Sequence, residues 1–316
     1  MNTTKIKCVL TALIVFCCSI QIYAQKYTAE FLNMGVGARA LGMGGAFVAI
    51  ANDATACYWN PAGLALLRQR EMTMMHATRF SGIVHSNFVN FVYPDQKGNA
   101  FGISWFRIGV DDIPKSTKLD EFNRPIIEGY MKNVDQAIFL SYSRQAAEKL
   151  YLGGNIKAIR QTVGDNSALG FGLDLAVLYR LANCVSLGLN LQDLAGTFIY
   201  WDTGHRDTKN PTLKWGVAFT KSFSKLKGDL TLAVDQNIRF EGETNENTFS
   251  VGDFAGSDFQ FGAEYWLFNL IAFRAGLDRQ YLTAGTGLKL KMFEIDYAFV
   301  SYELGNTHRI SGRVRF

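Results

Sequence analysis

Apolar and polar residues alternate with a period of two along most of this chain, and no other feature limits the fold as strongly. From about residue 70 to the end, roughly fourteen segments place apolar residues on one face and small or polar residues on the other. In the clearest segment, residues 169–180, leucine, phenylalanine, valine and tyrosine occupy every odd position. Each segment is about as long as a tilted strand that crosses a bilayer. The pattern therefore predicts an all-β fold, a transmembrane antiparallel β-barrel of about 14 strands.

The lengths of the connections separate a barrel from a soluble β-sandwich, which would show the same alternation. If the segments are numbered in order, the even connections are short and the long ones fall at odd positions. The short connections are 94–99, 145–149, 181–184, 222–229, 268–269 and 291–292, and the long ones are 111–133, 195–211 and 239–257. Short periplasmic turns and longer extracellular loops are typical of outer-membrane barrels, whereas a sandwich has no reason to sort its loops in this way.

Charged residues lie on the face opposite the apolar stripe. They are Arg274, Asp278, Lys289, Glu294, Asp296 and Arg313. A charge turned toward lipid would cost about 2–4 kcal/mol at mid-bilayer, so this sorting predicts a polar lumen. The chain also ends on an alternating strand with an aromatic terminus, Phe316, as outer-membrane barrels commonly do.

A register for the last two strands follows from a four-residue turn at 303–306. It pairs Asp296 with Arg313 and Glu294 with Arg315, both inside the lumen. The same register sets Ile295 against Val314 and Phe299 against Ile310 on the lipid face. We expect each ion pair to contribute at most about 1 kcal/mol in a wet lumen.

The N-terminus has the pattern of a cleaved secretory signal over residues 1–24. Lys5 and Lys7 precede an apolar run from Cys8 to Ile20, and small Ala24 stands before the expected cut. This run is shorter than the roughly 20 residues that a spanning helix needs. Cleavage would leave a chain of net charge about +2, which implies no basic or acidic partner such as nucleic acid. We therefore expect an outer-membrane location.

The residues that usually carry enzyme chemistry form no recognisable site. The four histidines lack metal-ligand spacing, and the mature chain keeps only two cysteines, Cys57 and Cys184, which do not form a C-x-x-C motif. One bridge between these two is an option, although two inert thiols fit better. In His85-Ser86-Asn87 the neighbours would point to opposite faces of a strand, so the serine lacks a base within reach. We expect no enzyme activity, no metal and no cofactor.

Residues 25–69 differ from the rest because they are rich in Gly and Ala and lack the period of two. Gly42, Gly44 and Gly45 permit close backbone packing, but they miss the G-x-G-x-x-G spacing of a nucleotide-binding loop. Asn60-Pro61-Ala62-Gly63 predicts a rigid corner, because proline fixes its own φ and glycine permits a reversal. The sequence therefore predicts three parts: signal 1–24, plug 25–69 and barrel 70–316. The corner would lock the plug or, alternatively, line a ligand gate.

Two stretches of this plug resemble a known family. They are FLNMGVGARALGMGGAFVA at residues 31–49 and NDATACYWNPAGL at residues 52–64. Together they are similar to the N-terminal signature of the PorV/PorQ family, whose fold is related to FadL-like fatty-acid channels. The resemblance implies a fourteen-stranded barrel with an N-terminal hatch that works with the type IX protein secretion system. The compact chain fits a shorter, PorQ-like or otherwise uncharacterised member better than a PorV-like shuttle.

Two functions remain open from the sequence. In the first, the barrel is a platform or shuttle component of the secretion system, and Phe198, Tyr200 and Trp201 in loop 195–211 dock a protein partner. An interfacial aromatic girdle is the alternative for these three residues. In the second, the barrel is a FadL-like channel for small hydrophobic molecules, with a continuous apolar pocket between plug and wall. A platform should tolerate shortening of loop 195–211 in folding but lose partner binding.

Overall fold

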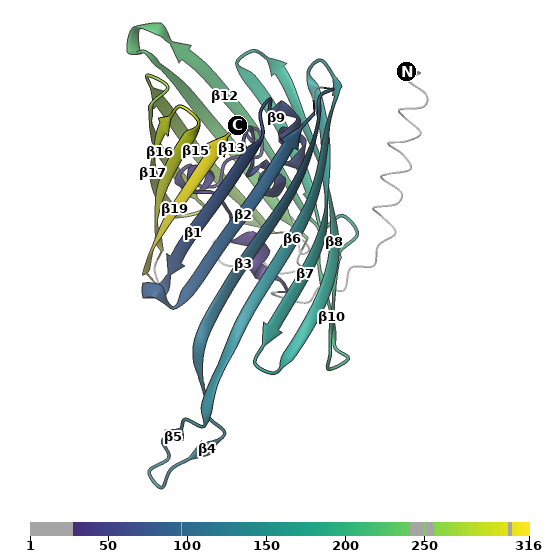
Figure 1. The fold of residues 1–316 in the computed structure, drawn as a ribbon, viewed down its shortest axis with the longest axis vertical. Helices are drawn as coiled ribbons and strands as arrows, with labels where there is room; N and C mark the ends of the chain where they lie inside the picture. The colour runs from purple at the N-terminus through teal and green to yellow at the C-terminus, as the bar shows by residue number, and fades with distance from the viewer. Residues whose placement is uncertain (1–27, 96, 241–248, 251–255, 303–304) are drawn as a thin grey trace.

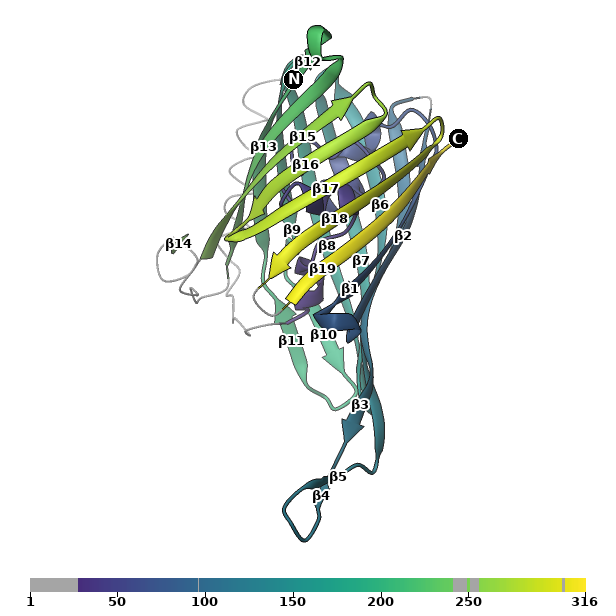
Figure 2. The same ribbon diagram turned by 90° about the vertical axis from the view of Figure 1, so that its left-hand side faces the viewer.

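A computed structural model describes residues 28–95, 97–240, 249–250, 256–302 and 305–316 of the chain. Fourteen antiparallel strands close into one barrel around the N-terminal segment, as the sequence predicts (Figures 1 and 2). The wall strands are β1 (Glu71–Arg79), β2 (Val84–Pro94), β3 (Asn99–Lys115), β6 (Gly129–Ala147), β7 (Leu150–Val163), β8 (Asn166–Ala182), β9 (Val185–Gln192), β12 (Thr212–Phe223), β13 (Gly228–Arg239), β15 (Gly256–Leu267), β16 (Ile271–Asp278), β17 (Tyr281–Leu290), β18 (Phe293–Tyr302) and β19 (Gly305–Arg315).

Short elements supplement this wall. The strands are β4 (Lys118–Leu119), β5 (Pro125–Ile126), β10 (Thr197–Trp201), β11 (Arg206–Lys209) and β14 (Phe249–Ser250), and the helical turns in the wall are η3 (Phe80–Gly82) and η4 (Ser224–Leu226). The N-terminal segment contains η1 (Glu30–Asn33), α2 (Ala38–Gly42), α3 (Ala56–Trp59) and η2 (Pro61–Leu66). None of the described helices has the length and hydropathy of a helix that crosses a membrane.

The barrel closes where the first wall strand meets the last. β1 pairs with β2 on one side and with β19 on the other, from Glu71 opposite Arg315 to Thr78 opposite His308. Two backbone hydrogen bonds of 3.1 and 3.0 Å between Arg70 and Phe316 extend this seam to the C-terminus. Because the sheet closes on itself, its backbone groups are paired around the whole circumference, as a bilayer requires.

The outer face of the wall carries the apolar stripe that the sequence predicts. On β8 the outward residues Leu169, Phe171 and Leu173 are 47–61% exposed, whereas the residues between them face inward and are buried. The short even connections gather at the end of the barrel that holds the C-terminus, at the top of Figure 1. The opposite end carries the longer connections, including the hairpin of β4 and β5, which projects beyond the wall.

The expected loop 195–211 is largely strand, so the prediction of a loop there is wrong. β10 pairs with β8 and with β11, and it places Phe198 and Tyr200 on the outer face of the wall at 45% and 49% exposure. Trp201 is half-buried and donates an indole hydrogen bond of 2.7 Å to Asp207. The four residues 193–196 separate β9 from β10 and act as a bulge. Odd-numbered residues face outward in β9, whereas even-numbered residues face outward in β10, so strict alternation in the sequence does not reveal β10.

The predicted register of the last two strands is wrong by two residues. Tyr302 pairs with Gly305 instead of Thr307, so Glu294 lies opposite Arg313 and Phe299 lies opposite His308. A shift of two preserves which side chains face the lumen, because successive side chains alternate between faces. Part of the expected turn, residues 303–304, lies outside the described residues.

Candidate functional site: the plug and the lumen wall

The described residues of the N-terminal segment, from Thr28 to Leu67, lie inside the barrel (Figures 1 and 2). Helix α2 packs against β17 and β18, and η2 packs against β6 and β7 on another side of the wall. The segment also holds the main apolar core, in which Phe31, Tyr58 and Trp59 pack with wall aromatics such as Phe106. This segment is called the plug below.

Glycines make the closest contacts between plug and wall. A Cβ on Gly42 would lie 3.2 Å from the Cα of wall residue Gly285, and one on Gly44 would lie 2.7 Å from the backbone of Leu277. A Cβ on Gly45 would lie 2.9 Å from the amide of Gln260. Gly44 has a φ of +65°, a backbone conformation that residues other than glycine rarely adopt. The three glycines singled out in the sequence therefore lie together at the interface with β15, β16 and β17.

The Asn60 corner lies on the other side of the plug, against β6, β7 and β8. Asn60 caps η2 by accepting a hydrogen bond of 3.1 Å from the Ala62 amide, and Pro61 occupies the first helical position. The Asn60 amide also donates to Val48 within the plug at 2.8 Å and to Val177 of the wall at 3.1 Å. A Cβ on Gly63 would overlap the Ala51 carbonyl. Asn60 therefore ties the two halves of the plug to each other and to the wall.

A buried ionic network joins the plug to the other side of the wall. Arg39 of α2 lies 3.0 Å from Asp53 of the plug and binds wall residue Glu264 through two hydrogen bonds of 2.7 and 2.8 Å. Glu264 in turn accepts a hydrogen bond of 2.7 Å from Arg274 Nε, and Arg274 Nη1 lies 2.7 Å from Asp296 Oδ1. Bidentate guanidinium–carboxylate pairs fix orientation as well as distance. This network therefore holds α2 in one position in the lumen.

The predicted lumen pairs belong to the same network. Arg313 Nη2 lies 3.4 Å from both Asp296 and Glu294, and Arg315 Nη2 lies 3.4 Å from Glu294. Arg313 also reaches plug residue Asp53 at 3.2 Å. The side chains of Arg313, Glu294 and Asp296 are at most 4% exposed, so the expectation of a wet lumen is wrong here. Removing one partner of a pair that is so deeply buried costs about 3–5 kcal/mol.

Sequence reasoning missed Arg39 and Asp53, although the sequence carries a signal for them. They are the only two charged residues between Phe31 and Leu64. A charge in so apolar a segment is rarely buried without a partner. Burial alone would raise the pKa of Asp53, but the guanidiniums of Arg313 and Arg39 hold it well below its usual range. Asp53 is therefore an ionised carboxylate that forms ion pairs with both arginines.

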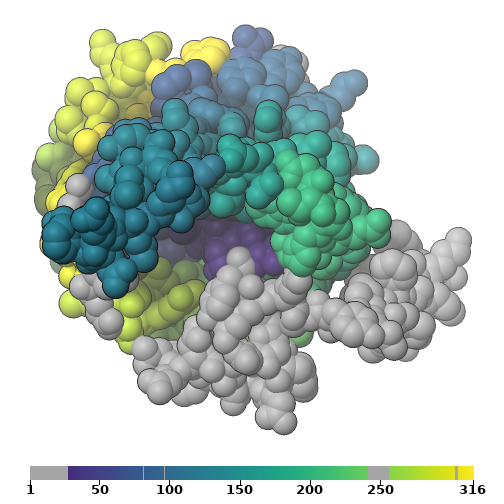
Figure 3. Space-filling view, turned by 90° about the horizontal axis from the view of Figure 1, so that it is seen from below, coloured from purple at the N-terminus to yellow at the C-terminus, as the bar shows by residue number. Residues whose placement is uncertain are grey.

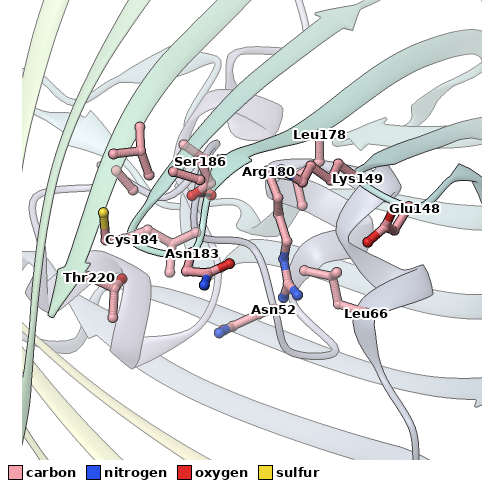
Figure 4. Close-up of a pocket in the computed structure, with 15 residues that line it drawn as sticks. Asn52, Leu66, Glu148, Lys149, Leu178, Arg180, Asn183, Cys184, Ser186 and Thr220 are labelled. Carbon is pink, nitrogen blue, oxygen red and sulfur yellow. Dashed lines mark hydrogen bonds between the residues drawn. The ribbon is translucent and has the colours of Figure 1, made fainter. Parts of the chain in front are cut away.

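Two cavities lie at opposite ends of the plug. The larger, of about 520 Å³, opens between plug residues Asn52 and Leu66 and the turns near the C-terminal end of the barrel (Figure 4). Arg180 extends its guanidinium into this cavity, toward Asn52 and Leu66 (Figure 4). The smaller, of about 50 Å³, lies between the plug at Met34 and Trp59 and the wall at the other end. The two cavities share no lining residue, and residues of the plug line both of them.

The mouth at the end opposite the C-terminus is hollowed, with the plug visible inside it (Figure 3). Beside this mouth, the hairpin of β4 and β5 exposes apolar side chains that the sequence analysis did not single out. They are Leu119, Phe122, Ile126 and Ile127, together with Tyr130 at the start of β6, and they are 43–74% exposed. Their signal in the sequence was the apolar content of loop 111–133.

The two cysteines among the described residues are unpaired. Cys57 and Cys184 are both free, and the buried Cys57 thiol accepts a hydrogen bond of 2.9 Å from Ser104. Within the described part of the chain, no three His, Cys, Asp or Glu residues are grouped to hold a metal ion.

A family model described as "Uncharacterised protein family (UPF0164)" matches residues 10–173. No curated protein is similar enough to the chain to count as a match. Among solved structures, the Ralstonia pickettii toluene transporter TbuX superposes with a TM-score of 0.58 at 15% identity, covering 89% of this chain and 98% of its own.

Two further structures show the same fold at similarly low identity. The CymD monoaromatic hydrocarbon channel has a TM-score of 0.62 at 15% identity and covers 89% of this chain and 96% of its own. A Pseudomonas aeruginosa FadL homologue has a TM-score of 0.57 at 12% identity and covers 89% and 98%. At these identities the likeness establishes a shared FadL-like barrel fold.

Proposed function

Since the chain belongs to the uncharacterised protein family UPF0164 and folds as a FadL-like barrel, we propose that it is an outer-membrane channel for small hydrophobic molecules. The observation that carries this proposal is the plug, which fills the lumen between two cavities and is held there by non-covalent contacts. A plug between two cavities gives a channel an element that can shift to let a solute pass. We further propose that the chain performs no catalysis.

The comparisons support this proposal through the neighbours' own functions. TbuX is a toluene transporter and CymD is a monoaromatic hydrocarbon channel, and both share this barrel over most of their length. Similar folds host different functions, so the plug has to be tested directly. In our proposal, a solute enters from the hollowed mouth, passes as the plug shifts, and leaves through the cavity of about 520 Å³ beside Arg180.

The uptake of radiolabelled toluene by cells tests the proposal. A strain that lacks the protein should accumulate toluene more slowly than the same strain complemented with the wild-type chain. Glu264→Gln removes the charge that holds Arg39, so the plug should loosen and uptake should rise. Gly45→Trp would fill the small outer cavity that Gly45 lines, and uptake should fall. Equal uptake by all four strains would contradict a channel.

A platform of the type IX secretion system is the second candidate. The PorV/PorQ-like residues of the plug suggest it, and the exposed apolar side chains of the β4–β5 hairpin, such as Phe122 at 74% exposure, offer a surface for a protein partner. Replacing residues 116–128 with a two-residue turn separates the candidates. If the protein is a platform, the shortened variant should lose partner association, and toluene uptake should be the same with or without the protein. If the protein is a channel, the shortened variant should take up toluene as fast as the wild type.

A further inference from the structure

Arg309 is a fully buried arginine without a partner. It lies on the lumen face of β19 at 0% exposure, and its Nε, Nη1 and Nη2 atoms have no hydrogen-bond partner. The other buried lumen cations of the network, such as Arg39 and Arg274, each bind a carboxylate at 2.7–3.0 Å. Among the described residues, no carboxylate forms such a pair with Arg309.

Two more side chains with an unpartnered polar atom lie near it in the sheet. Across the wall, Ala77 of β1 pairs with Arg309 of β19 on one side and with Ser86 of β2 on the other. The Ser86 hydroxyl is buried without a partner. Arg79 follows two positions after Ala77 on the same face, where a diagonal neighbour lies about 7–8 Å away. Arg79 donates one hydrogen bond of 2.9 Å to the Met34 carbonyl of the plug, and its Nε is unpartnered.

These groups share one chemistry, because each can donate a hydrogen bond to an anion. A guanidinium remains charged inside a protein, and two of them side by side repel each other when no anion lies between them. Such a group is costly to bury unpaired, and its planar donors match the oxygens of a carboxylate or phosphate. The hydroxyl of Ser86 offers a further donor.

We propose that Arg309, Arg79 and Ser86 form a binding site for an oxyanion, either the carboxylate of an organic solute or inorganic phosphate. Arg79 is the last residue of β1, so the site lies toward the end of the barrel opposite the C-terminus, on the side of the hollowed mouth seen in Figure 3. The Met34 carbonyl that Arg79 binds belongs to the plug, so an anion here would contact wall and plug together. This inference does not depend on the channel proposal.

Thermal unfolding of the purified protein in detergent, followed by the loss of its folded migration on a gel, tests the site. The probes are sodium butyrate and sodium phosphate, each compared with sodium chloride at equal ionic strength. A bound anion should raise the melting temperature of the wild type by on the order of 5 °C at a concentration about 100 times its Kd. A response to butyrate alone assigns an organic carboxylate, one to phosphate alone assigns phosphate, and a response to both assigns a general oxyanion site.

The variant Arg309→Met separates a ligand site from a structural role. It keeps the bulk of the side chain and removes the unpaired charge, so in sodium chloride it should melt at the wild-type temperature or higher and should not respond to either anion. The control Arg144→Met changes an exposed arginine and should retain the wild-type response. The proposal is overturned if neither anion stabilises the wild type, if Arg309→Met keeps the response, or if this variant melts below the wild type in sodium chloride.

Discussion

Arg39 shows how one side chain positions the plug. Its guanidinium binds Asp53 within the plug and Glu264 in the wall, so one residue holds the plug to itself and to β15. The contacts require that α2 lie against the wall, and the glycines that follow Arg39 make that approach feasible. At the residue scale, therefore, the ion pairs of Arg39 fix the position of the plug, and glycines without side chains let the plug approach the wall closely.

Replacing Arg39 with glutamine tests the weight of this contact. Arg39→Gln leaves two buried carboxylates with one arginine each, so we expect the free energy of unfolding to fall by about 3 kcal/mol. The control is Glu128→Gln, which breaks the exposed Lys118–Glu128 pair of 3.0 Å and should cost less than about 1 kcal/mol. Denaturant unfolding of both variants in detergent measures the difference. Equal costs would mean that the buried network does not hold the plug.

Substitution of Gly44 tests the close approach of plug and wall. Gly44→Ala places a Cβ 2.7 Å from the Leu277 backbone at a φ of +65°. The matched control Gly204→Ala has a φ of +83° but no atom within 4 Å of its new Cβ. Both changes strain the backbone by about 1 kcal/mol, and only the first adds a clash that costs about 1–3 kcal/mol more. If unfolding experiments find the two variants equally stable, the plug does not contact β16 as described.

At the element scale, two long connections at the mouth differ in kind, and most of the third predicted one, 239–257, lies outside the described residues. The β3–β6 connection ends in a hairpin that stands free of the wall, whereas β10 and β11 continue the wall by pairing with β8 and with each other. Replacing residues 116–128 with a two-residue turn should therefore leave the melting temperature unchanged within about 1 °C, because a change in loop length changes the free energy of folding only slightly.

Deletion of residues 197–209 is the informative counterpart. It removes both strands and leaves residues 168–171 of β8 without a partner on one edge, so we expect most of the protein to fail to fold. Heat-modifiable migration on a gel measures the folded fraction of both deletions. If the barrel folds without residues 197–209, β10 and β11 are not needed for the wall and are as dispensable as a loop.

These elements also show what the sequence can and cannot predict. The alternation along β8 and the short connections determine the strand count, the outward face and the order of the turns. Alternation cannot detect β10, because residues 193–196 insert an odd step into the pattern. It also cannot distinguish registers that differ by two, since Glu294 and Asp296 face the lumen in either one.

The candidate site was less predictable than the fold. The glycines and the Asn60 corner stand out by residue type, and the structure places them at the plug–wall contacts. The ionic network depends on pairs such as Arg39 and Glu264, which are 225 residues apart in the chain. Only closure of the barrel brings such residues together, so spacing in the sequence does not reveal them.

At the scale of the whole molecule, the apolar outer belt separates a membrane barrel from a barrel in water. Leu173 lies in the middle of β8 at 47% exposure, and Leu119 lies on the hairpin beyond the wall at 60% exposure. If the belt faces lipid, Leu173→Arg should lower the stability by about 2–4 kcal/mol, because the charge must enter the hydrocarbon. Leu119→Arg should change it by less than about 0.5 kcal/mol, as a surface substitution in water does. Unfolding of both variants from lipid vesicles measures the two costs, and a Leu173→Arg protein as stable as Leu119→Arg would place the belt outside the bilayer.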